Sequence, residues 1–269
     1  MTVSFVQLTC LMPMVKAAKY LRRIGIAALS GLALTACNPT PTLGESENAP
    51  EAQIDASTES DCAAVSDQSK SLYWGDIHVH TAYSLDAYGF GTFTTPADAY
   101  RFARGEPFEL AGETLRLARP LDFVAVTDHA EWLDMLYICT DPNQLNAAYC
   151  NRLREESSLA TGSEIFGDYV VPTITQEAPA KTPVCIDDPE LCELSLQNAW
   201  ARVQQQANSA NDPCNFTALI GFEWSATPSF SHTHRNVIFK SEAVVPFPID
   251  YIRYPDVTQL WPLLEQHCV

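Results

Sequence analysis

His78 and His80 stand two residues apart in WGDIHVH, a segment with the alternating pattern of a β-strand. Side chains two apart on a strand leave the same face, so both imidazoles can reach one metal ion. Asp76 shares that face and can either hold an imidazole tautomer or join the ligands. Neutral imidazoles suit zinc, iron, nickel and copper. The spacing therefore predicts a metal site, against the alternative of two histidines that face solvent.

Two further apolar runs end in residues that bind metals. The segments 121–127 and 216–222 are nearly continuous apolar runs, as expected of strands buried on both faces. The polar residues that follow these runs are Asp128, His129 and Glu223. An acid or imidazole at the end of a buried strand is costly without partners. Because three strand ends carry such residues, we expect them to meet at one site.

The elements that must position these residues alternate along the chain. The sequence predicts strands at 72–79, 121–127, 216–222 and 237–239, and helices at 96–104, 195–210 and 260–264. Thr95 and Pro96 mark the start of the first helix as its cap and first turn. This order is typical of an α/β sheet or barrel, whose chemistry lies at the carboxyl ends of the strands. The stretches 105–120 and 163–192, rich in Pro, Gly and acids, are interpreted as insertions.

Composition limits the classes of function. The 269 residues are 46% hydrophobic and 18% charged, which fits a globular chain with one large domain or two small ones. Acids outnumber Lys and Arg by 33 to 16, a formal net charge of −17, so a nucleic acid is not expected as a partner. No internal apolar run is long enough to span a membrane.

The N-terminal residues are expected to be an export signal. Four basic residues precede the apolar run 24–34, and the sequence LTAC then ends at Cys37. This pattern resembles a bacterial lipoprotein cleavage box, in which Cys37 is lipid-modified; the alternative is a buried amphipathic helix. We expect a signal peptide at 1–36 and a disordered acidic tether at 37–70. By the same resemblance, Asn38 favours the outer membrane, where the protein faces the periplasm or the surface.

Export also makes the cysteines candidates for disulfides. Spacing favours pairs Cys139–Cys150 and Cys185–Cys192, with Cys214–Cys268 as a third pair and Cys62 left over. None has the C-x-x-C spacing of a cysteine zinc site.

Together, the motifs resemble those of a known family. GDIHVHT, then SLDA at 84–87 and TDH at 127–129, look like the first two motifs of the PHP superfamily, the polymerase and histidinol phosphatase metallohydrolases. With YWGD, PLDFVAVTDHAE, GFEW and HRNVIF, the chain is similar to a group of large exported PHP-like bacterial proteins of unknown function. The resemblance covers 72–269. It implies a distorted β/α barrel and up to three clustered divalent ions, zinc or manganese and sometimes iron.

The resemblance also implies roles for individual residues. His78 and His80 match ligands of the first metal, Glu223 the carboxylate that bridges the first and second, and His234 a second-metal ligand. Asp86 and His129 match the third-metal positions, Asp76 and Asp128 would support the ligands, and Arg235 would clamp a phosphate. Glu223 and Asp128 are the residues expected to act in catalysis.

Some of these roles have rivals. Asp86 can equally be an acid of a turn. His234 precedes its apolar strand instead of following it, and His232 competes for the same role. The superfamily supplies further ligands after this point, so we interpret 71–269 as the N-terminal part of a PHP-like domain, a partial barrel whose partner is its missing C-terminal half. The alternative is a small open sheet with one depleted site.

The sequence thus predicts a metal-dependent hydrolase of phosphate esters, acting on a small phosphorylated substrate and incomplete in this chain. The rival is a non-catalytic, metal-binding surface lipoprotein attached to the membrane through its lipid alone. An amidohydrolase-type barrel also begins with H-x-H, but it needs a later metal-bridging lysine. No lysine lies between Lys70 and Lys181.

Overall fold

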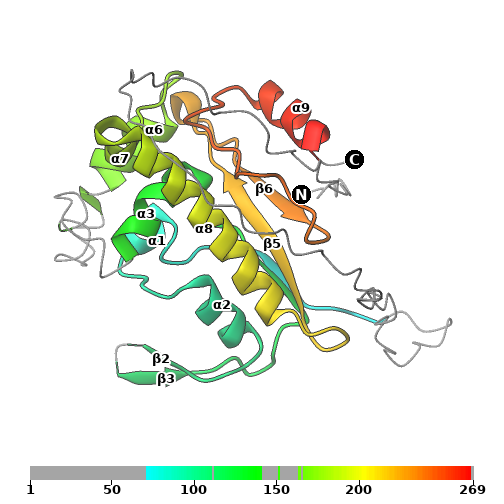
Figure 1. The fold of residues 1–269 in the computed structure, drawn as a ribbon. Helices are drawn as coiled ribbons and strands as arrows, with labels where there is room; N and C mark the ends of the chain where they lie inside the picture. The colour runs from blue at the N-terminus through cyan, green and yellow to red at the C-terminus, as the bar shows by residue number, and fades with distance from the viewer. Residues whose placement is uncertain (1–70, 111, 141–150, 152–162, 165, 268–269) are drawn as a thin grey trace, which may run out of the picture. The chain divides into compact units, whose positions relative to one another are not determined.

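A four-stranded mixed sheet lies at the centre of the fold (Figure 1). The computed structural model describes residues 71–110, 112–140, 151, 163–164 and 166–267. The strands of the sheet, in spatial order, are β1 (Gly75–Val79), β4 (Phe123–Val126), β5 (Thr217–Trp224) and β6 (Arg235–Phe239). β1, β4 and β5 run parallel, and β6 is antiparallel to β5. The fold is α/β. Within the described residues the sheet is partly open and does not close into a barrel.

Two helices cover one face of this sheet. α2 (Pro96–Ala103) packs on β4, and α8 (Pro189–Ala210) packs on β5 and on α2. The ring of Phe222 on β5 lies 5.8 Å from that of Trp200 on α8. Because side chains alternate along a strand, the neighbouring Glu223 leaves the opposite face, away from the helices.

The remaining elements are short. They are α1 (Leu85–Gly89), α3 (Leu133–Thr140), α6 (Val171–Ile174), α7 (Pro183–Asp187), α9 (Val257–His267), the hairpin β2 (Phe108–Leu110) and β3 (Glu113–Leu115), 3-10 turns at Ala130–Trp132 and Pro228–Phe230, and a π-helical turn at Phe166–Val170. No helix in the described part of the chain has the length and apolar content needed to cross a bilayer.

The four predicted strands and three predicted helices are all present, with shifted ends. α2 begins as expected, because Thr95 and Asp98 form a capping box. The two stretches interpreted as insertions contain regular elements. The stretch 163–192 contains α6, α7 and the first turn of α8, which Asp188 caps, and the stretch 105–120 forms the β2–β3 hairpin. α1 and α3 were not expected.

The core has two parts. The first lies between the sheet and α2, α8 and α9, and includes Tyr100, Trp200, Phe222 and Trp224. The second joins α1, α3, α6 and α7 around Trp132. Fully burying a large apolar side chain stabilises a fold by about 1.5–3 kcal/mol, so these clusters hold the sheet and its connecting turns in place.

The disulfide predicted between Cys185 and Cys192 is present and joins α7 to α8. Cys139 and Cys214 are also disulfide-bonded, but Cys150 and Cys268 lie outside the described residues, so those pairings stay predictions. The predicted signal peptide, lipidation site Cys37 and tether, together with Cys62, also lie outside them.

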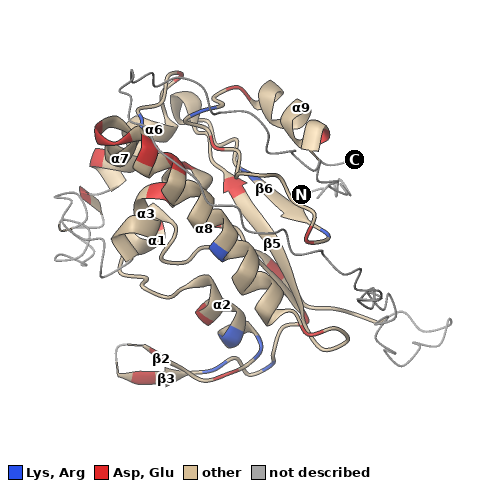
Figure 2. Cartoon of the chain, in the orientation of Figure 1, with Lys and Arg blue, Asp and Glu red and all other residues tan. Residues whose placement is uncertain are grey.

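Figure 2 shows Asp and Glu gathered around α7 and the first turns of α8.

Candidate metal centre

Strand direction brings the candidate ligands to one edge of the sheet. The carboxyl ends of β1, β4 and β5 meet there because these strands are parallel. His129 lies just past the end of β4 and pairs with Glu223 as an isolated parallel bridge. His234 reaches the same edge because it immediately precedes β6, which runs the other way. The structure thus brings together residues predicted from four separate segments.

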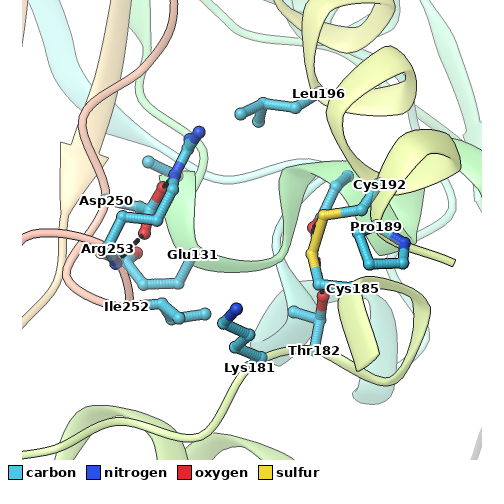
Figure 3. Close-up of a pocket in the computed structure, with 12 residues that line it drawn as sticks. Glu131, Lys181, Thr182, Cys185, Pro189, Cys192, Leu196, Asp250, Ile252 and Arg253 are labelled. Carbon is cyan, nitrogen blue, oxygen red and sulfur yellow. Dashed lines mark hydrogen bonds and ion pairs between the residues drawn. A yellow bond between two sulfur atoms is a disulfide. The ribbon is translucent and has the colours of Figure 1, made fainter. Parts of the chain in front are cut away.

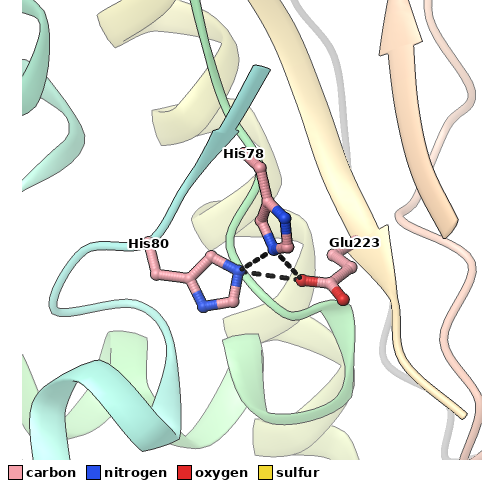
Figure 4. A group of neighbouring side chains, drawn as sticks. All are labelled: His78, His80 and Glu223. Atoms are coloured by element: carbon pink, nitrogen blue, oxygen red, sulfur yellow. Dashed lines mark hydrogen bonds and ion pairs between the residues drawn. The ribbon is translucent and has the colours of Figure 1, made fainter. Parts of the chain in front are cut away.

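Glu223 is the centre of the cluster (Figure 4). Its Oε2 lies 2.8 Å from Nε2 of His80 and 3.2 Å from Nε2 of His78. Its Oε1 lies 2.5 Å from Nδ1 of His234. The Nε2 atoms of His78 and His80 are 3.1 Å apart. His78, His80 and Glu223 therefore present one nitrogen or oxygen each to a common point, as the ligands of one ion would.

A second group shares His80 with the first. Nδ1 of His80 lies 3.3 Å from Oδ1 of Asp86, and Nε2 of His129 lies 3.3 Å from Oδ2 of the same carboxylate. These three residues also offer ligand atoms to one point. Nδ1 of His129 lies 3.7 Å from Oε2 of Glu223, which makes the two groups one continuous cluster. Asp86, in the first turn of α1, thus faces the histidines and is not merely an acid of a turn.

The electrostatics of the cluster are those of paired charges. Burial acts to raise the pKa of Glu223, but His234 and His80 outweigh it and hold that pKa well below its usual range. Burial likewise acts to raise the pKa of Asp86, and contacts with His129 and His80 reverse the effect. Burial lowers the pKa of His80, yet Asp86 and Glu223 raise it to about 10. The ionised carboxylates thus hold positive charge at this edge.

The donor set fits a divalent metal ion. Glu223 is fully buried, and both of its carboxylate oxygens lie close to imidazole nitrogens, Oε1 to His234 and Oε2 to His78 and His80. A buried carboxylate is costly without partners, and a cation shared by these nitrogens and oxygens would offset that cost. Imidazole nitrogens with carboxylate oxygens suit zinc, iron and manganese.

The side chain of Asp128 is held by the turn that follows β1, and its backbone carbonyl accepts the N–H of Glu223 at 2.9 Å. Its oxygens accept the backbone N–H of Thr81 at 2.6 Å, the hydroxyl of Thr81 at 2.7 Å and the hydroxyl of Ser84 at 2.6 Å. Ser84 in turn accepts the N–H of His129 at 3.1 Å. Asp128 therefore fixes the turn between His80 and Asp86. These contacts fit the predicted supporting role, and the part of Asp128 in catalysis stays a prediction.

β1 carries an irregularity at the histidines. The register with β4 shifts between Asp76 and Val79, as at a β-bulge. The carboxylate of Asp76 accepts the N–H of His78 at 3.0 Å, so it supports the backbone of His78 instead of its ring. From β6, the side chain of Asn236 donates to the carbonyl of Ile77 at 2.9 Å, which ties the two outer strands of the sheet together.

Three supporting residues were missed from the sequence. The hydroxyl of the fully buried Ser225 contacts Nδ1 of His129, and the hydroxyl of Thr227 lies 2.9 Å from Nε2 of His234. Asn236 is the third, through its bond to Ile77. In His129 and His234, a hydrogen bond at one ring nitrogen directs the other nitrogen toward a metal or a carboxylate. Ser225 follows Glu223 by two residues, so the strand pattern places it on the same face as Glu223. Serine is too common a residue type for that position alone to have indicated a role.

Two other sequence candidates lie differently from the cluster. Arg235 pairs with Trp224 across the sheet, so its side chain belongs to the face opposite to Glu223 and Asn236. Its guanidinium donates to the carbonyl of His234 at 2.8 Å. A phosphate-clamping role for Arg235 is therefore not favoured by its position. His232 is exposed, and its ring contacts that of His234 instead of Glu223.

Comparison with known proteins gives one match. A family model described as a protein of unknown function (DUF3604) matches residues 67–269, which include every residue of this cluster. No curated protein matches the chain, and no solved structure matches it.

Proposed function

The chain belongs to the DUF3604 family of proteins of unknown function, and we propose that its strand-end cluster is the centre of a metal-dependent hydrolase of phosphate esters. One observation carries the proposal: a fully buried carboxylate, Glu223, is shared by three imidazoles, with Oε2 close to His78 and His80 and Oε1 close to His234. A carboxylate in this position is suited to bridge two cations, because an anion between them lowers their repulsion.

The arrangement supports catalysis as well as binding. The side chain of His78 is 56% exposed while that of Glu223 is fully buried, so one side of the cluster opens to solvent and the other is enclosed. Divalent ions held by these residues would polarise a phosphoryl oxygen and lower the pKa of a water molecule toward neutrality. Ser225 and Thr227 would orient His129 and His234, and Asp128 would fix the turn that carries His80.

The finer details of this proposal come from the motifs. We assign His78 and His80 to a first metal, His234 to a second and Asp86 with His129 to a third, with Glu223 as the bridge, in a PHP-type fold. The ions would be zinc or manganese, or iron. The N-terminal sequence further suggests an exported lipoprotein, anchored through Cys37 and active in the periplasm or at the cell surface.

The test is the metal content of a Glu223→Gln variant. The purified protein should retain zinc or manganese after dialysis, measured by elemental analysis, and Glu223→Gln should lose at least one ion per chain. The substitution keeps the size of the side chain and removes the charge that holds the ions together. Glu113→Gln, an exposed acid on β3, is the matched control and should keep the full content.

Hydrolysis of a generic aryl phosphate ester should follow the metal content, falling at least 100-fold in Glu223→Gln, about 2.7 kcal/mol of transition-state stabilisation. An unchanged metal content in Glu223→Gln would refute the site. Full metal content with no turnover of a broad panel of phosphate esters would instead favour the metal-binding lipoprotein.

A further inference from the structure

The disulfide Cys185–Cys192 forms part of the wall of a cavity that is separate from the metal cluster (Figure 3). The cavity has a volume of about 180 Å³, far more than one water molecule needs. Asp134, in the first turn of α3, also lines it. None of the proposed metal ligands does so.

The carboxyl group of Asp134 contacts both sulfur atoms of the disulfide. Its Oδ2 lies 2.8 Å from Sγ of Cys185 and 3.1 Å from Sγ of Cys192, while its Oδ1 accepts the backbone N–H of Met135 at 2.6 Å. A disulfide sulfur carries no hydrogen, so a hydrogen bond between Oδ2 and either sulfur requires the proton to be on Asp134. The carboxyl group is therefore placed to protonate whichever sulfur is released when the disulfide is reduced.

Burial favours the protonated form of Asp134. The residue is 6% exposed, and burial raises the pKa of its carboxyl group to about 7, although hydrogen bonds from Met135 and Thr182 act to lower it. At neutral pH a large share of the molecules thus holds a proton beside the sulfurs. A thiolate released in such buried surroundings is poorly solvated, so it is stabilised by taking up that proton.

The other titratable groups around the cavity are placed differently. Glu131, Asp250 and Arg253 lie on the side opposite to the disulfide (Figure 3), and Nε of Arg253 lies 2.5 Å from Oδ2 of Asp250. Lys181, in the segment before α7, lines the cavity and is exposed, so its ammonium group would attract an approaching thiolate. The acids of α7 and the first turns of α8 are all exposed: Asp187, Asp188, Glu190 and Glu193.

The disulfide can be reached from solvent. Cys185 and Cys192 are both partly exposed, whereas Cys139, which is also disulfide-bonded, is only 1% exposed. Exchange with an external thiol requires access to one sulfur and a stabilised leaving group at the other. The cavity with the partly exposed cysteines meets the first requirement, and the proton on Asp134 meets the second.

We propose that Cys185–Cys192 undergoes thiol–disulfide exchange with a small dithiol, and that Asp134 donates a proton to the sulfur that leaves. One thiol of the dithiol loses its proton to water and its sulfur attacks one cysteine. The S–S bond breaks, and the other cysteine leaves as a thiol with the proton of Asp134. The second thiol of the reagent then loses its proton to water and displaces the attached cysteine, which takes up a proton from water. The dithiol is oxidised to a cyclic disulfide, both cysteines are reduced, and Asp134 regains its proton from water.

The rate of reduction by dithiothreitol tests this role of Asp134. The released thiols are alkylated at timed intervals and counted by mass spectrometry of the peptides that contain Cys185 and Cys192, which separates this disulfide from the others. At a constant concentration of reagent thiolate, the rate should fall at least tenfold from pH 6 to pH 8.5, because Asp134 loses its proton over this range. A disulfide with no neighbouring acid would give a constant rate.

Asp134→Asn keeps the shape of the side chain but has no proton to transfer. At pH 6 this variant should be reduced at least tenfold more slowly than the unsubstituted protein, with a rate that does not depend on pH. Asp187→Asn, which removes an exposed acid at the end of α7, is the matched control and should keep the falling profile. Urea denaturation at pH 6 would confirm that both variants fold.

Three outcomes would overturn the proposal: a disulfide that resists dithiothreitol at pH 6, a flat profile in the unsubstituted protein, or a falling profile retained in Asp134→Asn. The first two need no variant. None of these measurements depends on metal content or on the hydrolysis of phosphate esters.

Discussion

Asp128 differs from the other carboxylates of the centre because hydroxyl and amide groups, not imidazoles, surround it. Asp128→Ala would leave three buried donors without their acceptor. We expect the free energy of unfolding to fall by about 3 kcal/mol, measured by urea denaturation. Metal content should fall as well, since Thr81 and Ser84 connect His80 to Asp86.

Asp76→Ala is the matched control for that experiment. Asp76 is exposed and accepts one N–H that water can satisfy in its place, so stability should change by less than about 0.5 kcal/mol. Similar losses in both variants would show that the Asp128 hydrogen bonds do not hold the turn.

At the residue scale, the members of the cluster could be predicted from the sequence, but the residues that support them could not. His78, His80, His129 and Glu223 are unusual residues at the ends of apolar runs, and burial there requires partners. Ser225 and Asn236 are common types, and their contacts depend on which strand lies opposite. Arg235 shows the converse: it is a reasonable phosphate ligand by type, but the register of β6 places it on the face opposite to Glu223.

At the scale of elements, the direction of a strand determines which residues reach the site, and local sequence does not reveal that direction. His234 precedes an apolar segment, and only the antiparallel pairing of β6 with β5 brings it to the carboxyl ends of the other strands. α3 was missed because its sequence, LDMLYICT, is apolar on almost every side. It therefore lacks the alternation of one apolar and one polar face by which a helix is recognised in a sequence. α7 was missed because its segment is rich in Pro and acids.

The close contact between β1 and β4 gives a prediction for the element that carries His78 and His80. A Cβ atom at Gly75 would lie 2.3 Å from the carbonyl oxygen of Phe123, so Gly75→Ala must push the strands apart. We expect a loss of about 1–3 kcal/mol in unfolding free energy, together with weaker zinc retention during dialysis against a chelator.

Gly167→Ala is its control, because a Cβ atom there has no neighbour within 4 Å. The added methyl should leave zinc retention unchanged and stability unchanged or raised by about 0.4–1 kcal/mol. If Gly75→Ala behaved in the same way, the spacing of β1 from β4 would not matter to the centre.

For the whole molecule, alternation of apolar segments predicted the α/β class but not how far the sheet closes. The order β1-β4-β5-β6 comes from pairings between residues far apart in sequence, such as Gly75 with Phe123 and Phe123 with Thr217. The same long-range packing buries acids that local sequence presents as ordinary surface residues. Burial raises the pKa of Glu131, Asp134 and Asp250.

Asp134 makes the stability of the whole fold depend on pH. Burial raises its pKa from 3.8 to about 7, despite hydrogen bonds from the N–H of Met135 and the hydroxyl of Thr182 that lower it. Between these two values the folded protein keeps a proton that the unfolded chain releases, so stability should fall as pH rises through this window and level off above about 7. The fall is on the order of 4 kcal/mol, from about three pKa units at 1.36 kcal/mol each. Urea denaturation at several pH values between 4.5 and 7.5 measures it, and Asp134→Asn, which keeps an oxygen acceptor but cannot ionise, should reduce the slope, with the remainder due to Glu131 and Asp250. A slope unchanged in Asp134→Asn would assign the pH dependence to other groups.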